Sequence, residues 1–326
     1  MEAGSVCQGS RDNIRENNQE NSPTRTEKCD DLGPWTNFRP RGALARVLHE
    51  KVLQDQYLSR LDKSEWYNCN LSDLPVDLAQ SFVQLGPDQD TVHFLEESEK
   101  KSDWIFTQLW HALVKFVLGL FMTQTSINGW LQCGSMFVIS KSQLIKLLKV
   151  DENVRYDSLL DLGAGDGKVT AHLAPLFDKI YVTEVSETMK KLLGKQGYQV
   201  LDVEDWCQDR KFNVISCLNL LDRCNAPLSI LENIRNSLAP DGYVLLALVL
   251  PFSAYIETGS SDHKPVEALP VKGNTFESQV ESLVENVLRA KFELISWSRV
   301  PYLCEGDLRQ SYYWLDDVIL VLKATK

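Results

Sequence analysis

The sequence predicts an α/β fold: a mainly parallel, Rossmann-like sheet covered by helices on both faces and preceded by an N-terminal helical extension. Up to about residue 150 the apolar spacing is helical, whereas beyond it short apolar runs alternate with helical segments. Continuous apolar strands separated by helices are typical of a parallel sheet that is buried on both faces. The third observation is the stretch LLDLGAGDGKVT, Leu159–Thr170, in which three glycines directly follow an apolar run. It predicts a strand-to-helix turn that a small ligand approaches closely.

Three parts are expected along the chain. Residues 1–34 are polar and form a disordered tail, because they cannot bury enough apolar surface to offset the entropy of ordering. Residues 35–150 form the helical extension, with apolar residues spaced for helices at 43–53, at 103–122 and after Ser140. Its loop Thr125–Phe137 is a candidate lid over the ligand or a plain connection. Residues 151–326 form the α/β domain.

The elements of the α/β domain follow from this alternation. Strands are expected at 158–165, 179–186, 198–203, 212–221 and 243–251, with helices at 167–177, 186–196, 227–238 and 276–290. Two later apolar runs, 292–304 and 314–324, have no helical pattern between them. They predict an antiparallel hairpin at the edge of the sheet.

Composition bounds the class of protein. The chain has 326 residues, 44% of them hydrophobic, and a net charge of −11, so a sizeable core is expected and a nucleic-acid partner is not. None of the eight cysteines forms a C-x-x-C pair, and no metal site is expected. The first residues show no pattern of a secretory signal peptide. The most apolar window, 113–122, is too short to span a bilayer, and it predicts a buried helix. We therefore expect a cytoplasmic protein without a membrane span. The sequence leaves the oligomeric state open, and a monomer is the first expectation.

The glycine loop narrows the ligand. Gly163 and Gly165 let the backbone turn tightly against a ligand, and Gly167 eases close packing where the next helix begins. Dinucleotide sites use G-x-G-x-x-G, whose helix N-terminus receives a pyrophosphate. Here Lys168 stands where the third glycine of that pattern belongs, which disfavours NAD.

Acidic residues around the loop point to a cationic cofactor. Asp161 and Asp166 flank the glycines and would repel a pyrophosphate, but they would attract an ammonium group and a sulfonium. S-adenosylmethionine carries both, and we expect it as cofactor. Glu184 ends the next strand, 23 positions after Asp161, where an acid accepts hydrogen bonds from ribose hydroxyls. After the third strand, either Glu204 or Asp205 is the candidate contact for the adenine amino group.

A second constellation ends the fourth strand, in SCLNLLDRC. Methyl transfer needs a nucleophile held in line with the departing sulfur. Asn219 can orient a polar group, and Asp222 can accept an N–H, hold one imidazole tautomer and stabilise positive charge on the ring. Both are candidate catalytic and substrate-binding residues, and a histidine acceptor suits them. The alternative is an Asx turn and a helix cap before PLSILENI.

Two aromatic stretches near the C-terminus, VPYLCEGD and QSYYWLDD, are further candidates. Their aromatic side chains either line a substrate groove or pack in the core. The residues concerned are Tyr302, Tyr312, Tyr313 and Trp314.

Taken together, several motifs resemble one known family. TSING, GSMFV, LLDLGAGDG, TEVSETM, ISCLNLLDRC, LALVLPF, VPYLCEGD and YYWLDD look like the DREV-type methyltransferases, from about Trp104 to the C-terminus. The resemblance implies a class I, seven-strand, S-adenosylmethionine-dependent fold. It also implies protein-L-histidine N-pros-methyltransferase activity on proteins carrying His-x-His, with 1-methylhistidine as product. As an alternative to the cytoplasm, the resemblance implies association with endomembranes, either the ER or mitochondria.

The resemblance also implies roles for single residues. By position in the family's motifs, Asp161, Gly163 and Gly165 form the cofactor loop, and Glu184 is the ribose-binding acid. Asn219 and Tyr302 contact the cofactor, and Asn219 also lies near the target ring. Asp222 engages the target imidazole, and Tyr313 contacts the substrate.

Two other functions stay open from the residues alone. One is a class I methyltransferase for another acceptor, such as a lysine, a protein terminus or a small molecule. The other is a catalytically inactive binding scaffold. A broken glycine loop or a missing Glu184 would indicate the scaffold, and the sequence has neither defect.

Overall fold

The computed structural model describes residues 40–119, 124–208, 210–256 and 263–325, so the predicted disordered tail, 1–34, lies outside the described residues. The chain divides into two compact units. The first contains the described residues up to Lys63, together with Gln89–Phe137 and Leu303–Leu315. The second contains Ser64–Asp88, Val138–Tyr302 and Asp316–Lys326. These units do not follow the expected boundary at residue 150, and that boundary stays a prediction.

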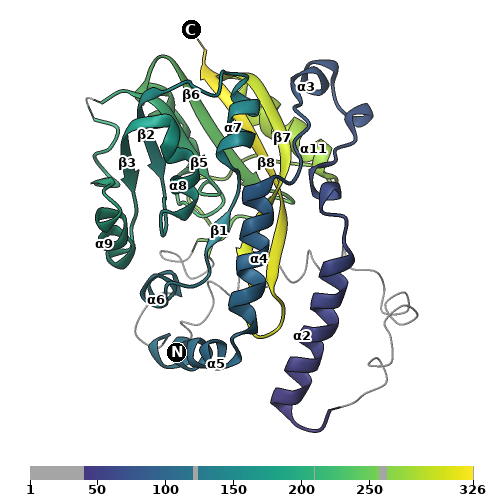
Figure 1. Cartoon of the computed structure of the whole chain (residues 1–326). Helices are drawn as coiled ribbons and strands as arrows, with labels where there is room; N and C mark the ends of the chain where they lie inside the picture. The colour runs from purple at the N-terminus through teal and green to yellow at the C-terminus, as the bar shows by residue number, and fades with distance from the viewer. Residues whose placement is uncertain (1–39, 120–123, 209, 257–262, 326) are drawn as a thin grey trace. The chain divides into compact units, whose positions relative to one another are not determined.

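A twisted sheet forms the centre of the second unit (Figure 1). Its strands are β2 (Tyr156–Leu162), β3 (Phe177–Thr183), β4 (Gln199–Leu201), β5 (Phe212–Leu218), β6 (Leu238–Val249), β7 (Phe292–Glu305) and β8 (Tyr312–Ala324). The end of β7 and the start of β8, within Leu303–Leu315, belong to the first unit. Their order is β7-β8-β6-β5-β2-β3-β4. The pairs from β6 to β4 are parallel, and β8 is antiparallel to β6. This is the class I arrangement, so the predicted α/β fold class is confirmed.

The two strands of the predicted hairpin lie together at one end of the sheet. β7 and β8 are neighbours, and only the two-residue strand β1 (Met136–Phe137) lies beyond β7. β8 is the inner strand, between β7 and β6, and nearly every residue on both of its faces is buried. A strand that is apolar on both faces is more stable inside a sheet than along its border.

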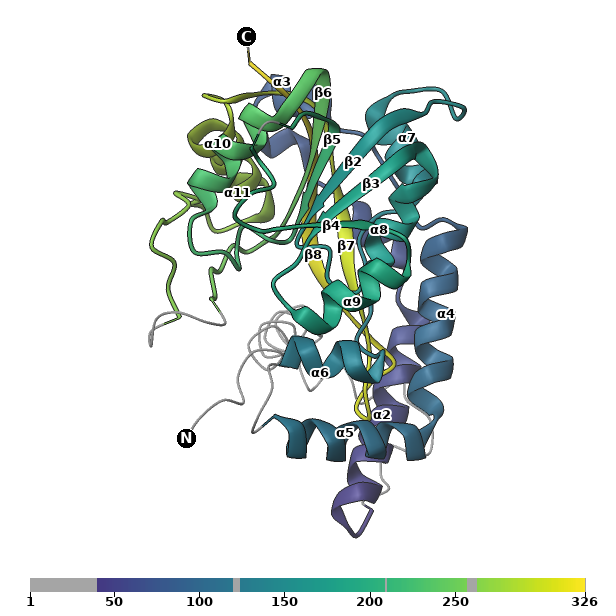
Figure 2. The same cartoon turned by 90° about the vertical axis from the view of Figure 1, so that its left-hand side faces the viewer.

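Helices cover both faces of this sheet (Figure 2). One face carries α7, α8 and α9, and the other carries α10 and α11. Their bounds are α7 (Lys141–Leu148), α8 (Lys168–Leu173), α9 (Glu187–Lys195), α10 (Pro227–Ser237) and α11 (Phe276–Leu283). Shorter helical segments are η2 (Lys63–Tyr67), η3 (Leu71–Asp73), α3 (Val76–Ser81), η4 (Ala174–Leu176) and the π-helical η5 (Val284–Leu288). Ser140 begins α7 as predicted, because Gln143 N donates to its Oγ at 3.0 Å and its own N–H donates to Gln143 Oε1 at 3.0 Å.

The first unit is mainly helical. It contains α2 (Ala43–Arg60), α4 (Gln89–Asp103), α5 (Ile105–Leu118), α6 (Gln124–Leu131) and the short strand β1 (Met136–Phe137). β1 pairs antiparallel with Leu303 and Cys304. The candidate lid, Thr125–Phe137, therefore consists of most of α6, a turn and β1, and its function as a lid stays a prediction.

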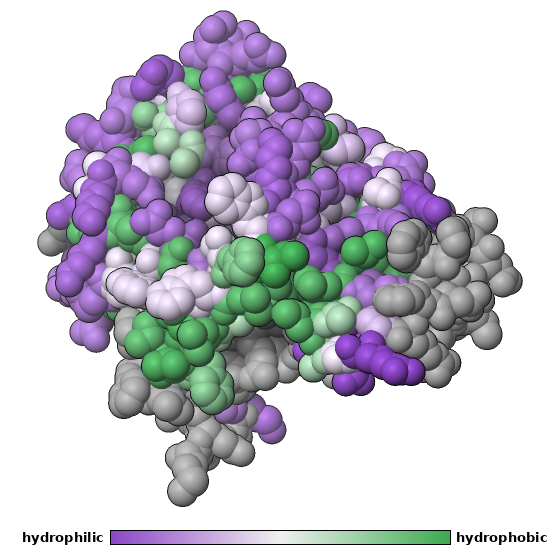
Figure 3. Space-filling view, turned by 60° about the horizontal axis from the view of Figure 1, so that its bottom comes forward, coloured by the Kyte–Doolittle hydropathy of each residue, from purple (hydrophilic) through white to green (hydrophobic). Residues whose placement is uncertain are grey.

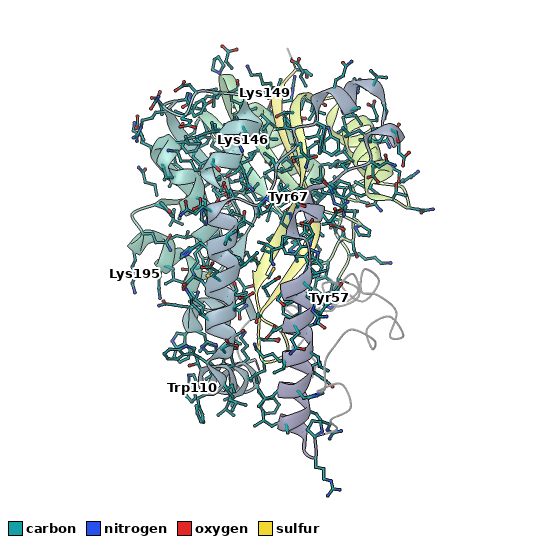
Figure 4. All side chains as sticks on the ribbon, turned by 45° about the vertical axis from the view of Figure 1, so that its right-hand side comes forward. Tyr57, Tyr67, Trp110, Lys146, Lys149 and Lys195 are labelled. Atoms are coloured by element: carbon teal, nitrogen blue, oxygen red, sulfur yellow. The ribbon has the colours of Figure 1, made fainter. Side chains whose placement is uncertain are left out.

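The buried helix expected over 113–122 is wrong where the structure describes it. Leu113 and Phe116 on α5 are 55% and 79% exposed, and Val114 is the buried residue of this helix. Trp110 on the same helix also lies at the surface (Figure 4). The surface of the molecule shows a broad apolar area (Figure 3). The polar residues of the helix lie on one side, so its spacing predicts that the apolar side packs, and the structure instead leaves most of that apolar side exposed.

Two further expectations concern α5. The single helix expected over 103–122 is divided at Trp104, which separates α4 from α5, and residues 120–123 lie outside the described ones. Across the described ranges, each helix is too short or too polar to cross a bilayer. The cytoplasmic compartment stays a prediction.

Candidate functional site

The glycine turn follows β2 and is open on one side. Gly163 and Gly165 have φ of +70° and +56°, a region that glycine adopts without strain. A Cβ added to Gly165 would meet no atom within 4 Å, so free space lies beside this backbone. Thr183 holds the turn from β3, since its Oγ1 accepts from Gly163 N at 3.2 Å. The turn is thus preformed, with room for a ligand against it.

Gly167 has the packing role that the sequence predicts. It precedes α8 with φ +78°, and a Cβ there would lie 2.8 Å from Leu193 Cδ2 on α9. Only glycine lets these two helices approach so closely. The close packing fixes the direction in which α8 leaves the turn.

Glu184 joins the end of β3 to the glycine turn. Its Oε2 accepts from Gly165 N at 3.1 Å, and its Oε1 accepts from Val185 N at 2.9 Å and Ser186 N at 2.8 Å. The side chain is buried. Three backbone donors fix the carboxylate at the place where the sequence predicts a ribose-binding acid.

Asp161 is buried beneath the turn. It accepts hydrogen bonds from Thr170 Oγ1 at 2.5 Å and Ser216 Oγ at 2.6 Å. Burial raises its pKa to about 6, and the two hydroxyl groups oppose that rise. Burial raises the pKa of the Cys217 thiol on the neighbouring strand β5, and the charges of Cys224, Asp161 and Asp222 add to this rise.

Glu204 and Asp205 lie in the turn after β4. Both are exposed. Glu204 N donates to Asp202 Oδ1 at 2.9 Å, and Asp205 Oδ1 accepts from Gln208 Nε2 at 2.8 Å. The adenine contact stays open between these two acids.

Asn219 and Asp222 lie at the carboxyl end of β5 and are buried. Asn219 has φ +55°, which Asn tolerates better than most residues, and its N–H donates to Ala247 O of β6 at 3.0 Å. Asp222 Oδ2 lies 3.4 Å from Arg223 Nε. The buried oxygens Asn219 Oδ1 and Asp222 Oδ1 have no hydrogen-bond partner. The structure therefore brings together two acceptors that a bound ligand with N–H groups would satisfy.

A third side chain belongs to this cluster, and sequence reasoning missed it. Asp317 on β8 is fully buried, and its Oδ2 accepts from Asn219 Nδ2 at 2.7 Å. Burial raises the pKa of Asp317 to about 8; the hydrogen bond from Asn219 opposes this and the charge of Asp222 adds to it. Burial also raises the pKa of Asp222, while Arg223 lowers it. The available signal was an acid inside the apolar run WLDDVILVL.

The two predicted tyrosines lie in different units. Tyr302 is a buried residue of β7 in the second unit, with the cofactor turn. Tyr313 is a buried residue at the start of β8 in the first unit, and its Oη donates to Asp307 Oδ1 at 3.0 Å. The contacts expected of Tyr302 with cofactor and of Tyr313 with substrate stay predictions.

Asp317 should make the folded state less stable as pH rises. Its pKa is 3.8 ordinarily and about 8 here, so the folded chain keeps a proton that the unfolded chain releases between those values. The free energy of unfolding therefore decreases as pH rises through this window. Asp317→Asn removes this dependence, and we expect its melting temperature to exceed that of the wild type at pH 8 and to approach it at pH 4. Asp316→Asn on the same strand, which alters an ion pair with Arg299, is the control; equal pH dependence in Asp317→Asn and wild type would contradict the expectation.

These features define a class of protein. A sheet of this order, with an open glycine turn after its first parallel strand and a fixed acid after the next, is a class I methyltransferase sheet. The open space beside Gly165 and the acids nearby fit S-adenosylmethionine, a cation without phosphate. The chain belongs to the DREV methyltransferase family, whose model matches residues 66–324. The match begins before Trp104, where the resemblance was first evident, and it confirms the predicted family and the predicted cofactor.

Individual relatives are more distant. A ubiquinone biosynthesis O-methyltransferase of Actinobacillus pleuropneumoniae is 28% identical over 105 residues, which cover 28% of this chain and 45% of that protein. The protein of the same name from Haemophilus ducreyi is 29% identical over 105 residues, 28% of this chain and 44% of that protein. The matched part thus spans less than half the length of these curated relatives.

Similar solved structures include the N-methyltransferase NodS of Bradyrhizobium japonicum bound to S-adenosyl-L-homocysteine, with 13% identity, a TM-score of 0.37 and coverage of 57% of this chain and 86% of that one. A TehB-like methyltransferase of Corynebacterium glutamicum has 14% identity, a TM-score of 0.36 and coverage of 57% and 87%.

Proposed function

We propose that this protein transfers a methyl group from S-adenosylmethionine to the pros nitrogen of histidine in His-x-His segments of proteins, giving 1-methylhistidine. The observation that carries the proposal is the pair of buried, unpartnered acceptors Asn219 Oδ1 and Asp222 Oδ1 beside the cofactor turn. A neutral imidazole offers an N–H to such an acceptor and a lone pair on its other nitrogen. The motif resemblance supports the choice of His-x-His.

Asp222 has the central role in the proposed mechanism. Its carboxyl group accepts the N–H of the tele nitrogen and so holds the tautomer in which the pros nitrogen is unprotonated. Asn219 orients the ring, and the cofactor supplies an electrophilic methyl group. Positive charge then develops on the imidazole, and the Asp222 carboxylate stabilises it. Burial raises the pKa of Asp222, and the charge of Arg223 opposes this rise.

The direct test uses peptides. The protein is incubated with methyl-labelled S-adenosylmethionine and a His-x-His peptide, and the methylated nitrogen is identified by mass spectrometry and amino-acid analysis. Peptides in which one or both histidines are replaced by Ala are the controls. We expect label on the pros nitrogen of the His-x-His peptide. Label on a lysine, on a protein terminus, or on a hydroxyl group, the kind of acceptor that an O-methyltransferase uses, would replace this proposal. Binding of S-adenosylhomocysteine without any transfer would indicate a scaffold.

The rate should depend on the protonation of the target. A histidine with a pKa of about 6.5 is mostly protonated at pH 5.5 and mostly neutral at pH 7.5. Because only the neutral ring has a free lone pair, we expect kcat/KM for the peptide to rise through this interval. S-adenosylhomocysteine affinity, measured over the same interval, controls for loss of the cofactor site. A flat rate from pH 5.5 to 7.5 would contradict attack by a neutral imidazole.

A further inference from the structure

Asp317 lies opposite the end of a neighbouring strand in the site. The register pairs Asp317 with Val249, the last residue of β6, at the same edge of the sheet where β5 ends and leads into Asn219 and Asp222. The side chain of its neighbour Asp316 lies on the opposite face of the strand, because side chains alternate along a strand. Asp316 Oδ1 lies 2.7 Å from Arg299 Nη2. Two adjacent acids therefore have different surroundings: Asp316 is paired with a cation, and Asp317 faces Asn219.

The burial of Asp317 needs a reason beyond stability. It is 0% exposed, its Oδ1 has no hydrogen-bond partner, and the nearby acid Asp222 raises its pKa further. A buried carboxyl group with one unsatisfied oxygen is unfavourable, and an apolar residue of similar size in such a place is often more stable. The rest of β8 from Val318 to Leu322 is apolar. Such an exception within an apolar strand is expected at a functional site.

The contact that Asp317 makes controls the orientation of another side chain. An Asn amide presents two donors on Nδ2 and an acceptor on Oδ1, and rotation by half a turn exchanges them. Asp317 Oδ2 accepts from Asn219 Nδ2 at 2.7 Å, so this oxygen carries no proton, and any proton of the carboxyl group lies on Oδ1. The reversed amide would put its oxygen against this accepting oxygen. The nitrogen is thereby held toward β8, and Oδ1 is left without a protein partner.

We propose that Asp317 is a positioning residue of the methyl-transfer site: it fixes the amide of Asn219 so that the amide oxygen, not the nitrogen, faces the bound ligand. The inference rests on the proposed function for the identity of that ligand. Asp317 acts through Asn219 and needs no contact with the substrate. The oxygen that it leaves free selects a ligand that carries N–H groups.

A double-mutant cycle tests whether Asp317 acts through Asn219. Asp317→Val removes the acceptor oxygen and suits an apolar strand, and Asp317→Ala is the second variant in case Val does not pack. Asn219→Gly removes the amide and keeps the positive φ without strain. Asp317→Asn, which retains an acceptor of the same shape, is the rescue variant. Asp316→Ala is the matched control in the same strand.

The expected result is a loss of turnover without a loss of folding. Misplacement of a positioned group costs up to about 100-fold, and we expect kcat on a His-x-His peptide to fall by roughly this factor in Asp317→Val and in Asn219→Gly. The double variant should lose no more than Asn219→Gly alone, because the two residues act as a unit. Asp317→Asn should recover much of kcat, Asp316→Ala should retain it, and Asp317→Val should melt no lower than the wild type.

Losses that multiply in the double variant overturn the inference, as does a fall in kcat that merely follows a lower melting temperature. The same double-mutant cycle is also measured as affinity for S-adenosylhomocysteine by calorimetry, which tests the role of Asp317 without depending on methyl transfer. If the wild type methylates none of the peptides, the proposed function fails and the calorimetric cycle alone decides. Non-additive losses of affinity then support the role of Asp317, and additive or absent losses overturn it.

Discussion

Asp222→Asn should bind S-adenosylhomocysteine as tightly as the wild type and should lose methyl transfer by roughly 10³-fold, within the range of a positioned acid–base group. The physical reason is that the carboxyl group of Asp222 only accepts from the ring, whereas an amide can present its NH₂ to the ring N–H and cannot stabilise the imidazolium. Its buried Oδ1 has no protein partner, so little else in the fold depends on this atom. Single-turnover rates with labelled cofactor and calorimetry with S-adenosylhomocysteine measure the two quantities.

The matched control for Asp222 is Asp178→Asn. Asp178 is exposed and its Oδ1 lies 2.8 Å from Arg155 Nη2, so this substitution also neutralises one carboxylate and loosens one ion pair. We expect unchanged turnover in the control. Full activity in Asp222→Asn would exclude Asp222 from the chemistry, and lost cofactor affinity would assign it to the cofactor site instead.

Glu184→Gln should weaken S-adenosylhomocysteine binding by roughly 10- to 100-fold, since hydrogen bonds to a charged group contribute about 1.5–3 kcal/mol and each 1.4 kcal/mol is tenfold. The carboxylate is an acceptor on both oxygens and is held by three backbone N–H groups. An amide would place its NH₂ against one of these donors, which loosens the glycine turn and removes an acceptor for ribose hydroxyls. Isothermal titration measures the affinity, and thermal melting reports the smaller effect on stability.

Glu187→Gln provides the comparison for Glu184. Glu187 is an exposed residue at the start of α9, 2.8 Å from Lys190 Nζ. The same change of charge therefore occurs close in sequence but away from the turn, and we expect wild-type affinity. If Glu184→Gln also binds with wild-type affinity, Glu184 is a structural anchor of the turn and does not hold the cofactor.

The sequence predicted most of the second unit because its signals are local. Each parallel strand is an apolar run and each covering helix has its own periodicity, and Gly167 could be assigned to packing from its place at a strand-to-helix turn. The signals that failed depend on distant partners. The insertion of β8 beside β6 joins residues about 70 positions apart, such as Val249 and Asp317, which no window of the sequence contains. The exposure of α5 likewise depends on which neighbours it lacks.

The same distinction applies within the candidate site. Glu184 could be found from its spacing after the glycine turn, and Asn219 and Asp222 from their place at a strand end. Asp317 could not, because an acid in WLDDVILVL is equally consistent with a surface position, and only the pairing of β8 with β6 brings this residue to Asn219.

The place of β8 also has a consequence for how the protein matures on the ribosome. Residues 156–249, with the glycine turn and the Asn219–Asp222 segment, are synthesised well before β8, so β6 first lies at an open border with unpaired backbone groups. Pairing with β8 closes that border and, in the same event, delivers Asp317 to Asn219. A nascent chain halted before β8 would therefore present the parallel strands and the glycine turn, but would lack the strand that covers β6 and the carboxyl group that we propose orients Asn219.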